Sequence, residues 1–77
     1  MRERIEINPG IHFGKPCVAG TRIRVQDVLE LIQEGLSFDT IIQDYYPDLQ
    51  QEDIRACMQY VLDMINAEDL HVTEAAA

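Results

Sequence analysis

The segment over residues 14–25 constrains the fold of this chain most, because amphipathic packing alone does not explain its sequence, Gly-Lys-Pro-Cys-Val-Ala-Gly-Thr-Arg-Ile-Arg-Val. Gly14 and Gly20 accept backbone angles with positive φ, which other residues resist. Pro16 fixes φ and removes an N–H donor. We therefore predict a shaped loop whose structural residues are Gly14, Pro16, Gly20 and Thr21.

A basic edge follows this loop. Ile23 and Val25 alternate with Arg22 and Arg24, and in extended backbone this alternation puts the two guanidinium groups on one face. If the protein binds DNA, this edge and the N-terminal arm are the candidate contacts, acting as a β-ribbon in a dimer. The predicted DNA-binding residues are Arg2, Arg4, Lys15, Arg22 and Arg24. The alternative for Arg22 is an ion pair with a nearby carboxylate that holds the loop.

The length of 77 residues allows one domain. A domain of this size buries only about 60–65% of its unfolded surface, so its core is thin and association is favoured. Cys17 and Cys57 have no tight spacing, and residues 1–20 contain no apolar run typical of a signal peptide. We expect a cytoplasmic protein with reduced thiols. We expect no membrane partner, because no apolar run approaches the roughly 18 residues that a membrane helix needs.

The net charge of −8 is unevenly distributed along the chain. Residues 1–24 carry five cations against two acids, a net charge of +3. Residues 25–77 carry one cation, Arg55, against twelve acids, a net charge of −11. This segregation favours opposite surfaces with different partners, although a cationic arm folded onto its own acidic body explains it equally well.

A short β element is predicted at the N-terminus. Ile5 and Ile7 alternate with Arg4 and Glu6, and the Asn-Pro-Gly sequence at residues 8–10 ends the strand. We expect it to form a hairpin-like pair with the region over residues 17–23. Two strands this short are marginal alone, so they must pack on helices or pair with a second subunit. The second option predicts a homodimer.

Three helices are predicted after residue 24. Gly35 ends the first as a left-handed cap, Ser37 begins the second as its N-cap, and Pro47 stops the second. A third helix begins after a cap at Asp48 or Gln50 and runs to about residue 66. The apolar faces of the first two are expected to be Val25, Val28, Leu29 and Ile32, followed by Phe38, Ile41, Ile42 and Tyr45.

The third helix is apolar on more than one side. Its main stripe consists of Ile54, Cys57, Val61 and Ile65. Further apolar residues widen this stripe, so one face covers the core of the domain and another is left for a second chain. The predicted dimer residues are Met58 and Met64. The predicted partner-binding residues are Tyr60 and Leu62, together with Leu70 and Val72 of a C-terminal tail over residues 67–77 that we expect to be flexible.

Several short motifs occur together in this chain. They are Gly-Lys-Pro at 14–16, Gly-Thr-Arg-Ile at 20–23, a helix over 25–35 ending in Gly, a Ser-led helix from 37, Tyr-Pro at 46–47, and Glu-Asp-Ile-Arg-Ala at 52–56. In combination they resemble the short bacterial and archaeal proteins catalogued as domain of unknown function four-three-three, from about residue 5 to 65. Two positions depart from the pattern of that family: Arg24 replaces its usual Pro, and Gln50 replaces its usual Thr cap.

The resemblance implies a fold and a function. The implied fold is a homeodomain-like helix bundle with a small β element. The implied function is that of an antitoxin in a toxin–antitoxin pair, often encoded beside a PIN-like nuclease toxin.

The last two helices have the spacing of a helix-turn-helix, in which the last helix would read DNA bases. The charges of that helix argue against base reading. The residues that would face DNA are Gln51, Glu52, Asp53 and Gln59, and only Arg55 would offset the two carboxylates among them. Contacts between cationic side chains and phosphates supply most of the affinity for nucleic acids, so this helix is poorly suited to bind them.

Motifs for catalysis or cofactors are weak. The Walker pattern for phosphate binding is absent, so we expect no nucleotide cofactor. His12, Cys17, Cys57 and His71 are the available imidazole and thiol ligands, and they lack paired spacing, so we expect no metal site. For nucleophilic catalysis by Cys17, His12 is the nearby candidate base. A buried structural role for Cys17 is far commoner.

These observations predict a mainly α protein: a three-helix, homeodomain-like (helix-turn-helix-like) bundle over residues 25–66, preceded by a basic β arm and loop over residues 1–24. The predicted function, which the resemblance implies, is that of a non-enzymatic, antitoxin-like protein that binds a PIN-like nuclease toxin, with operator DNA as a further partner. One alternative is a stand-alone DNA-binding transcriptional regulator. The other is a thiol enzyme that uses Cys17.

Overall fold

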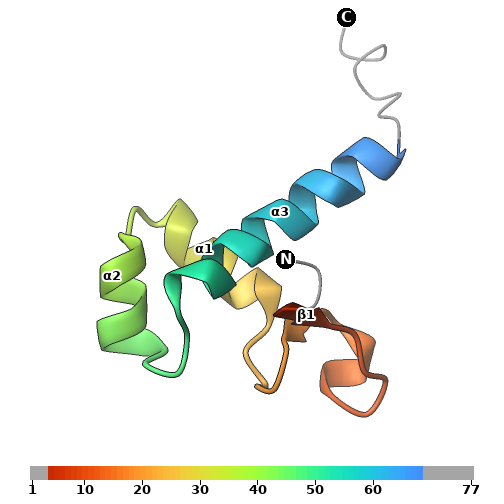
Figure 1. Ribbon diagram of the computed structural model, residues 1–77, viewed down its shortest axis with the longest axis horizontal. Helices are drawn as coiled ribbons and strands as arrows, with labels where there is room; N and C mark the ends of the chain where they lie inside the picture. The colour runs from red at the N-terminus through yellow and green to blue at the C-terminus, as the bar shows by residue number, and fades with distance from the viewer. Residues whose placement is uncertain (1–3, 69–77) are drawn as a thin grey trace, which may run out of the picture.

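The computed structural model describes residues 4–68 (Figure 1). Its elements are β1 (Ile5–Glu6), η2 (His12–Gly14), β2 (Cys17–Val18), α1 (Val25–Gln33), α2 (Phe38–Thr40), η3 (Ile41–Tyr45) and α3 (Gln51–Glu68). The described chain is therefore mainly α, with three helices (α1, the continuous α2–η3, and α3), the short 3₁₀ turn η2 and one small sheet, which confirms the predicted fold class. Helix α3 continues past the expected end at residue 66. Arg2, Leu70 and Val72 lie outside the described residues.

The two strands pair antiparallel within one chain, with Ile5 opposite Val18 and Glu6 opposite Cys17. On its other side, Cys17 forms an isolated antiparallel bridge with Arg24. The predicted hairpin-like β element is thus present, and its pairing is intramolecular.

The loop after β2 closes through the Thr21 side chain. The Thr21 hydroxyl donates to the Val18 carbonyl oxygen at 2.8 Å and accepts from the Ile23 N–H at 3.0 Å. Gly14 and Gly20 adopt positive φ of 82° and 79°. These contacts return the chain to the sheet and direct it into α1.

Local caps define where the first two helical segments begin and end. Gly35 has a φ of 95°, and its N–H donates to the Ile32 carbonyl while the Leu36 N–H donates to the Leu31 carbonyl. This pair of bonds is the Schellman arrangement that satisfies the last carbonyls of a helix. Ser37 then accepts the Thr40 N–H on its hydroxyl at 3.1 Å and so caps α2. Both caps confirm the sequence prediction.

The second helical segment departs from regular α-helix. Its last five residues form the π-helical segment η3, in which the Tyr46 N–H donates to the Ile41 carbonyl at 2.8 Å. A π turn holds one residue more than an α turn, so the apolar face shifts by one position. Tyr46 therefore packs on the core, while Tyr45 is half exposed. The expectation that Tyr45 lies on the buried face was wrong for this reason.

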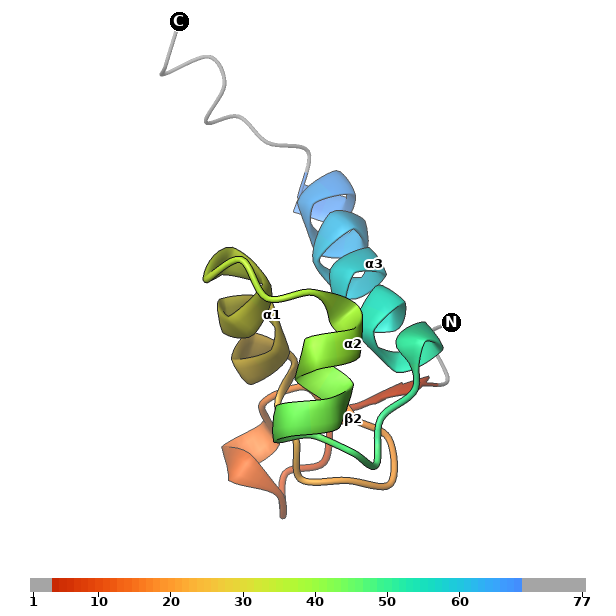
Figure 2. The same ribbon diagram turned by 90° about the vertical axis from the view of Figure 1, so that its left-hand side faces the viewer.

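The core lies where α1, η3 and the first half of α3 meet the sheet. Its largest fully buried side chains are Ile41, Ile54, Val28 and Cys57. Leu31 and Leu49 are also buried, although the sequence prediction had not assigned them to the core. Ile65 was expected on the buried stripe and is instead exposed, because the second half of α3 extends beyond the other elements (Figures 1 and 2).

An ion pair fastens the N-terminal arm to the start of α3. Arg4 Nη1 donates to Asp53 Oδ1 at 2.8 Å, and the other oxygen of that carboxylate accepts the Gln50 N–H at 2.8 Å. The second bond is one half of a capping box, in which a side chain in the first helical turn reaches back to the N-cap N–H. Asp53 thus begins α3 and positions β1 beside it.

Candidate functional site

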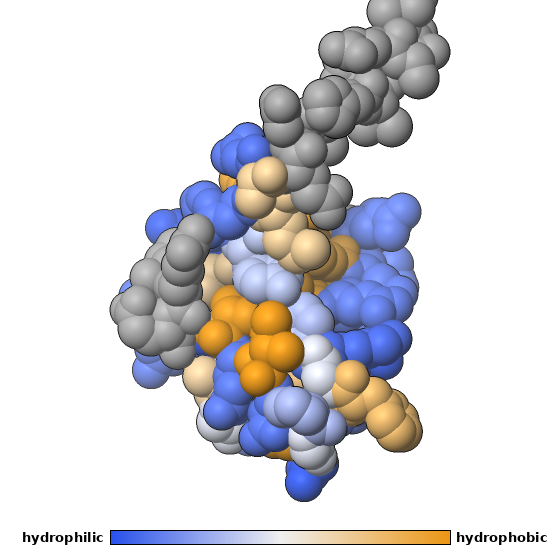
Figure 3. Space-filling view, turned by 90° about the vertical axis from the view of Figure 1, so that its right-hand side faces the viewer, coloured by the Kyte–Doolittle hydropathy of each residue, from blue (hydrophilic) through white to orange (hydrophobic). Residues whose placement is uncertain are grey.

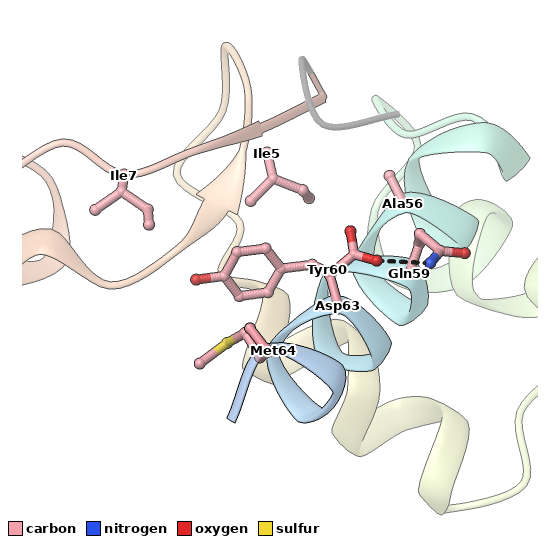
Figure 4. Close-up of a pocket in the computed structure, with 8 residues that line it drawn as sticks. Ile5, Ile7, Ala56, Gln59, Tyr60, Asp63 and Met64 are labelled. Atoms are coloured by element: carbon pink, nitrogen blue, oxygen red, sulfur yellow. Dashed lines mark hydrogen bonds between the residues drawn. The ribbon is translucent and has the colours of Figure 1, made fainter. Parts of the chain in front are cut away.

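A groove of about 350 Å³ runs between β1 and the second half of α3 (Figure 4). It is lined by Ile5, Ile7, Ala56, Gln59, Tyr60, Asp63, Met64 and Ala67. Figure 4 shows the Tyr60 ring pointing from α3 towards the strand, with Met64 one turn further along. Ile7 and Met64 expose 58% and 46% of their surface. The groove therefore presents apolar surface to solvent.

Polar groups lie on one side of this groove. Gln59 Nε2 donates to Asp63 Oδ1 at 2.9 Å. Figure 3 shows the molecule from the side on which β1 and the end of α3 lie, and a hydrophobic patch there is surrounded by hydrophilic surface. An apolar patch with a polar rim is typical of an interaction site.

A second apolar surface lies on another side of α3. We call Met58, Leu62 and Ile65 the α3 stripe; they expose 39%, 52% and 39% of their surface. Successive residues in an α-helix are about 100° apart, so these three cluster while Tyr60 points nearly opposite to Leu62. The structure thus separates the predicted pairs: Tyr60 lies with Met64 in the groove, and Met58 lies with Leu62 on the stripe.

The predicted DNA-binding residues have different surroundings. Arg24 forms a two-bond ion pair with Asp27, at 3.0 Å and 2.8 Å, and Arg4 is paired with Asp53. Lys15 and Arg22 are exposed, and within residues 4–68 neither side chain forms an ion pair. Only part of the predicted basic edge is therefore available to a ligand.

The turn before the Gly-Lys-Pro loop contains a site residue that sequence reasoning missed. Phe13 is 100% exposed, and both Phe13 and His12 have positive φ, at 57° and 49°. The His12 ring donates through Nε2 to the Arg22 carbonyl at 2.8 Å, since a carbonyl only accepts. This bond ties the turn to the basic edge. The one sequence signal for a site at this turn is the absence of acidic residues between Glu6 and Asp27.

Residues 5–61 match the model of the family described as Protein of unknown function (DUF433). The match covers most of the chain. The chain belongs to this family. No curated protein and no solved structure matches it significantly. The DUF433 match includes the Phe13 turn, the strands and Tyr60, and it ends at Val61, so Leu62, Met64 and Ile65 lie beyond it.

Both cysteines of this DUF433 chain are free and buried. Burial raises the pKa of the Cys57 thiol to about 12, and the nearby Asp53 carboxylate acts in the same direction. Burial also raises the pKa of Cys17, although Arg24 lowers it in part. The Cys17 Sγ donates to the Lys15 carbonyl at 3.4 Å, and His12 is bonded to Arg22.

We expect both thiols to react slowly in the folded DUF433 protein, because only thiolates are nucleophilic and burial raises both pKa values. For Cys57, a pKa of about 12 leaves roughly one thiol in ten thousand ionised at pH 8. Labelling with a chromogenic disulfide at pH 8 should be at least about a hundredfold slower in buffer than in urea. Rapid labelling of Cys17 in the native protein, mapped by mass spectrometry, would contradict this and favour the thiol-enzyme alternative.

Within residues 4–68 no three His, Cys, Asp or Glu side chains lie together in a group suited to a metal ion. Within the same residues, none of the helices has the length and apolar character needed to cross a membrane.

Proposed function

We propose that this DUF433 protein is an antitoxin-like, non-enzymatic binding protein of the cytoplasm that forms a homodimer and holds a PIN-like nuclease toxin through α3. The observation that carries the proposal is the α3 stripe, which lies exposed on a helix extending beyond its own core. The antitoxin role rests on the family resemblance. The stripe supports it because a helix with one unpartnered apolar face suits an apolar groove on another protein.

The chemistry of the stripe indicates where the affinity would arise. Met58, Leu62 and Ile65 bring thioether and aliphatic groups together within two helical turns. Binding energy concentrates in a few residues that become fully desolvated, whereas exposed ion pairs contribute little. Leu62 is the most exposed of the three and is the expected centre of the contact.

The charge of the body indicates which class of partner it would meet. Residues 25–77 have a net charge of −11. A nuclease that approaches RNA phosphates needs positive surface, and complementary charge speeds and orients association. The acidic body therefore supports a basic nuclease partner and disfavours a stand-alone nucleic-acid binder.

Operator DNA is a secondary part of this proposal. Arg4 and Arg24 are paired with carboxylates. Among the predicted DNA-binding residues that the structure describes, Lys15 and Arg22 therefore remain available. The logarithm of the DNA-binding constant falls with the logarithm of the salt concentration, with a slope of about −0.9 for each phosphate that the protein neutralises. Tight complexes make roughly 6–10 such phosphate contacts. Two cations per chain supply too few, so DNA binding would require the dimer and the toxin.

The test is a Leu62→Asp variant co-expressed with the tagged product of the adjacent reading frame. We expect at least a thirtyfold loss of affinity for the nuclease, because a carboxylate would be buried in an apolar contact. Added negative charge alone would favour a basic partner, so it cannot explain a loss. Gln43→Asp, which adds the same charge at an exposed site on η3, is the matched control and should bind normally.

Circular dichroism must show the same helix content for both variants. Undiminished capture by a folded Leu62→Asp protein would overturn the role of the stripe. If the adjacent product is not a nuclease and does not bind the unaltered protein, the antitoxin proposal itself fails.

A further inference from the structure

The exposed Phe13 lies in a turn that several hydrogen bonds hold. Its ring makes no burying contact with the described chain, yet two consecutive non-glycine residues adopt left-handed angles to present it. Such angles cost of order 1–3 kcal/mol each and persist where the surroundings enforce them. The His12 bond to Arg22 and the Gly14 and Lys15 N–H bonds back to Ile11 and His12 provide that enforcement. An aromatic side chain on a backbone that is held in this way is well suited to anchor an interface.

The surroundings of Phe13 limit what it can bind. Lys15 and Arg22 are exposed nearby in sequence, and no acidic residue occurs between Glu6 and Asp27. Single-stranded nucleic acid would stack on such a ring and contact such cations. Two available cations on a chain of net charge −8 provide little phosphate affinity, however. An apolar cavity with an acidic rim on a protein matches these features better.

The same chain carries such a cavity. The groove between β1 and α3 is apolar along Ile5, Ile7, Tyr60 and Met64, has about 350 Å³ of space, and has the Asp63 carboxylate in its lining. The acidic body adjoins it through α3. The exposed Phe13 with its neighbouring cations and the apolar groove on the acidic helix α3 are thus two complementary surfaces on one molecule.

We propose that the Phe13 turn of one copy occupies the β1–α3 groove of a second copy, and that the second copy returns the same contact. This contact specifies the homodimer included in the proposed function and rests on it. A twofold axis makes every contact occur twice, so one insertion implies its mate. Each phenylalanine would bury about 150–250 Å², and burial of the surrounding Ile7 and Met64 adds to this. Lys15 and Arg22 then face the acidic body of the second copy, of which α3 is a part.

The contact also explains how one small chain could serve two partners. The groove contains Tyr60 and Met64, whereas the α3 stripe contains Met58, Leu62 and Ile65 on another side of the helix. A second copy in the groove leaves the stripe accessible to the nuclease. Dimerisation and toxin binding can then be disrupted separately.

The test is sedimentation equilibrium of the full chain between 1 and 100 µM, a range chosen to span dissociation constants of typical specific contacts. Phe13→Ala should weaken the dimer at least about thirtyfold, since it removes both anchors. Tyr45→Ala, which removes a half-exposed aromatic side chain outside the groove, is the matched control and should leave the dimer unchanged. Met64→Lys should weaken the dimer similarly, because it places a charge in the apolar groove that would receive Phe13.

Mixing the two variants gives the decisive measurement. A Phe13→Ala chain retains an intact groove and a Met64→Lys chain retains an intact Phe13, so their heterodimer recovers one of the two contacts. We expect the mixed dimer to be at least about fivefold tighter than either variant dimer. No gain on mixing would overturn the proposal, as would a Phe13→Ala protein that dimerises normally or an unaltered protein that is monomeric at 100 µM.

Two further measurements separate this contact from other assignments. Toxin capture by Phe13→Ala should persist, and its loss together with normal dimerisation would place Phe13 in the nuclease interface instead. Binding of fluorescent single-stranded oligonucleotide that depends on Phe13, with the dimer unaffected, would assign the turn to nucleic acid. Failure of the stripe variant to affect toxin capture concerns only the proposed function.

Discussion

Replacing Ile54 by alanine is expected to lower the free energy of unfolding by about 2–5 kcal/mol. Ile54 is fully buried in the first turn of α3, within a core cluster that includes Val28, Ile41 and Cys57. Truncation removes buried methyl and methylene groups and leaves a cavity that a close-packed core only partly fills. The free energy of unfolding of a small domain is about 5–15 kcal/mol in total, so this loss is a large part of the stability.

Chemical denaturation at one fixed chain concentration measures this loss, since an associating protein gains stability with concentration. Ile65→Ala is the matched control: it makes the same truncation on the same helix at a side chain that is 39% exposed. Its expected cost is below about 1 kcal/mol. Equal losses at the two positions would show that the second half of α3 is as deeply buried as the first.

Replacing Asp53 by alanine is expected to cost about 1.5–3 kcal/mol, because one carboxylate makes two structural hydrogen bonds. Oδ2 accepts the Gln50 N–H at the start of α3, and Oδ1 accepts from Arg4 on the arm. Asp53 exposes only 13% of its side chain. Removing the Asp53 carboxylate therefore removes the capping hydrogen bond of α3 and the ion pair that holds the N-terminal arm.

The same denaturation experiment should include Glu52→Ala, an exposed acid in the same helical turn, which is expected to cost less than about 0.5 kcal/mol. Adding Arg4→Gln in both the normal and the Asp53→Ala background isolates the ion pair. We expect a coupling energy of about 0.5–1 kcal/mol, since Arg4 is 40% exposed and solvent screens the pair. Full additivity would show that the capping bond alone accounts for the loss.

Much of this fold follows from local sequence. Gly35, Ser37 and Pro47 mark helix ends through effects confined to one turn: left-handed φ, a hydroxyl cap and a ring that excludes helical angles before it. The short strands were likewise predictable from alternation and turn residues. Each of these signals acts within a few residues, so tertiary packing does not alter it.

The sequence did not determine features that depend on an irregular helical turn or on contacts between distant residues. Regular helical periodicity placed Tyr45 inside, whereas the π turn closed by Tyr46 and Ile41 moved the face by one residue. Arg4 was assigned to DNA from its charge, and only folding brings it within 2.8 Å of Asp53, which lies 49 residues away. The DNA role itself stays a prediction.

The candidate sites illustrate the same division. Periodicity reveals how many faces of a helix are apolar, so the excess of apolar residues on the last helix predicted a second chain, and this stays a prediction. The path of β1 decided which apolar residues share a site, because it places Ile5 and Ile7 beside Tyr60 and Met64 in one groove. The exposure of Phe13 also emerged only in three dimensions, since a left-handed angle at a non-glycine residue is enforced by hydrogen bonds across the fold rather than by its own preference.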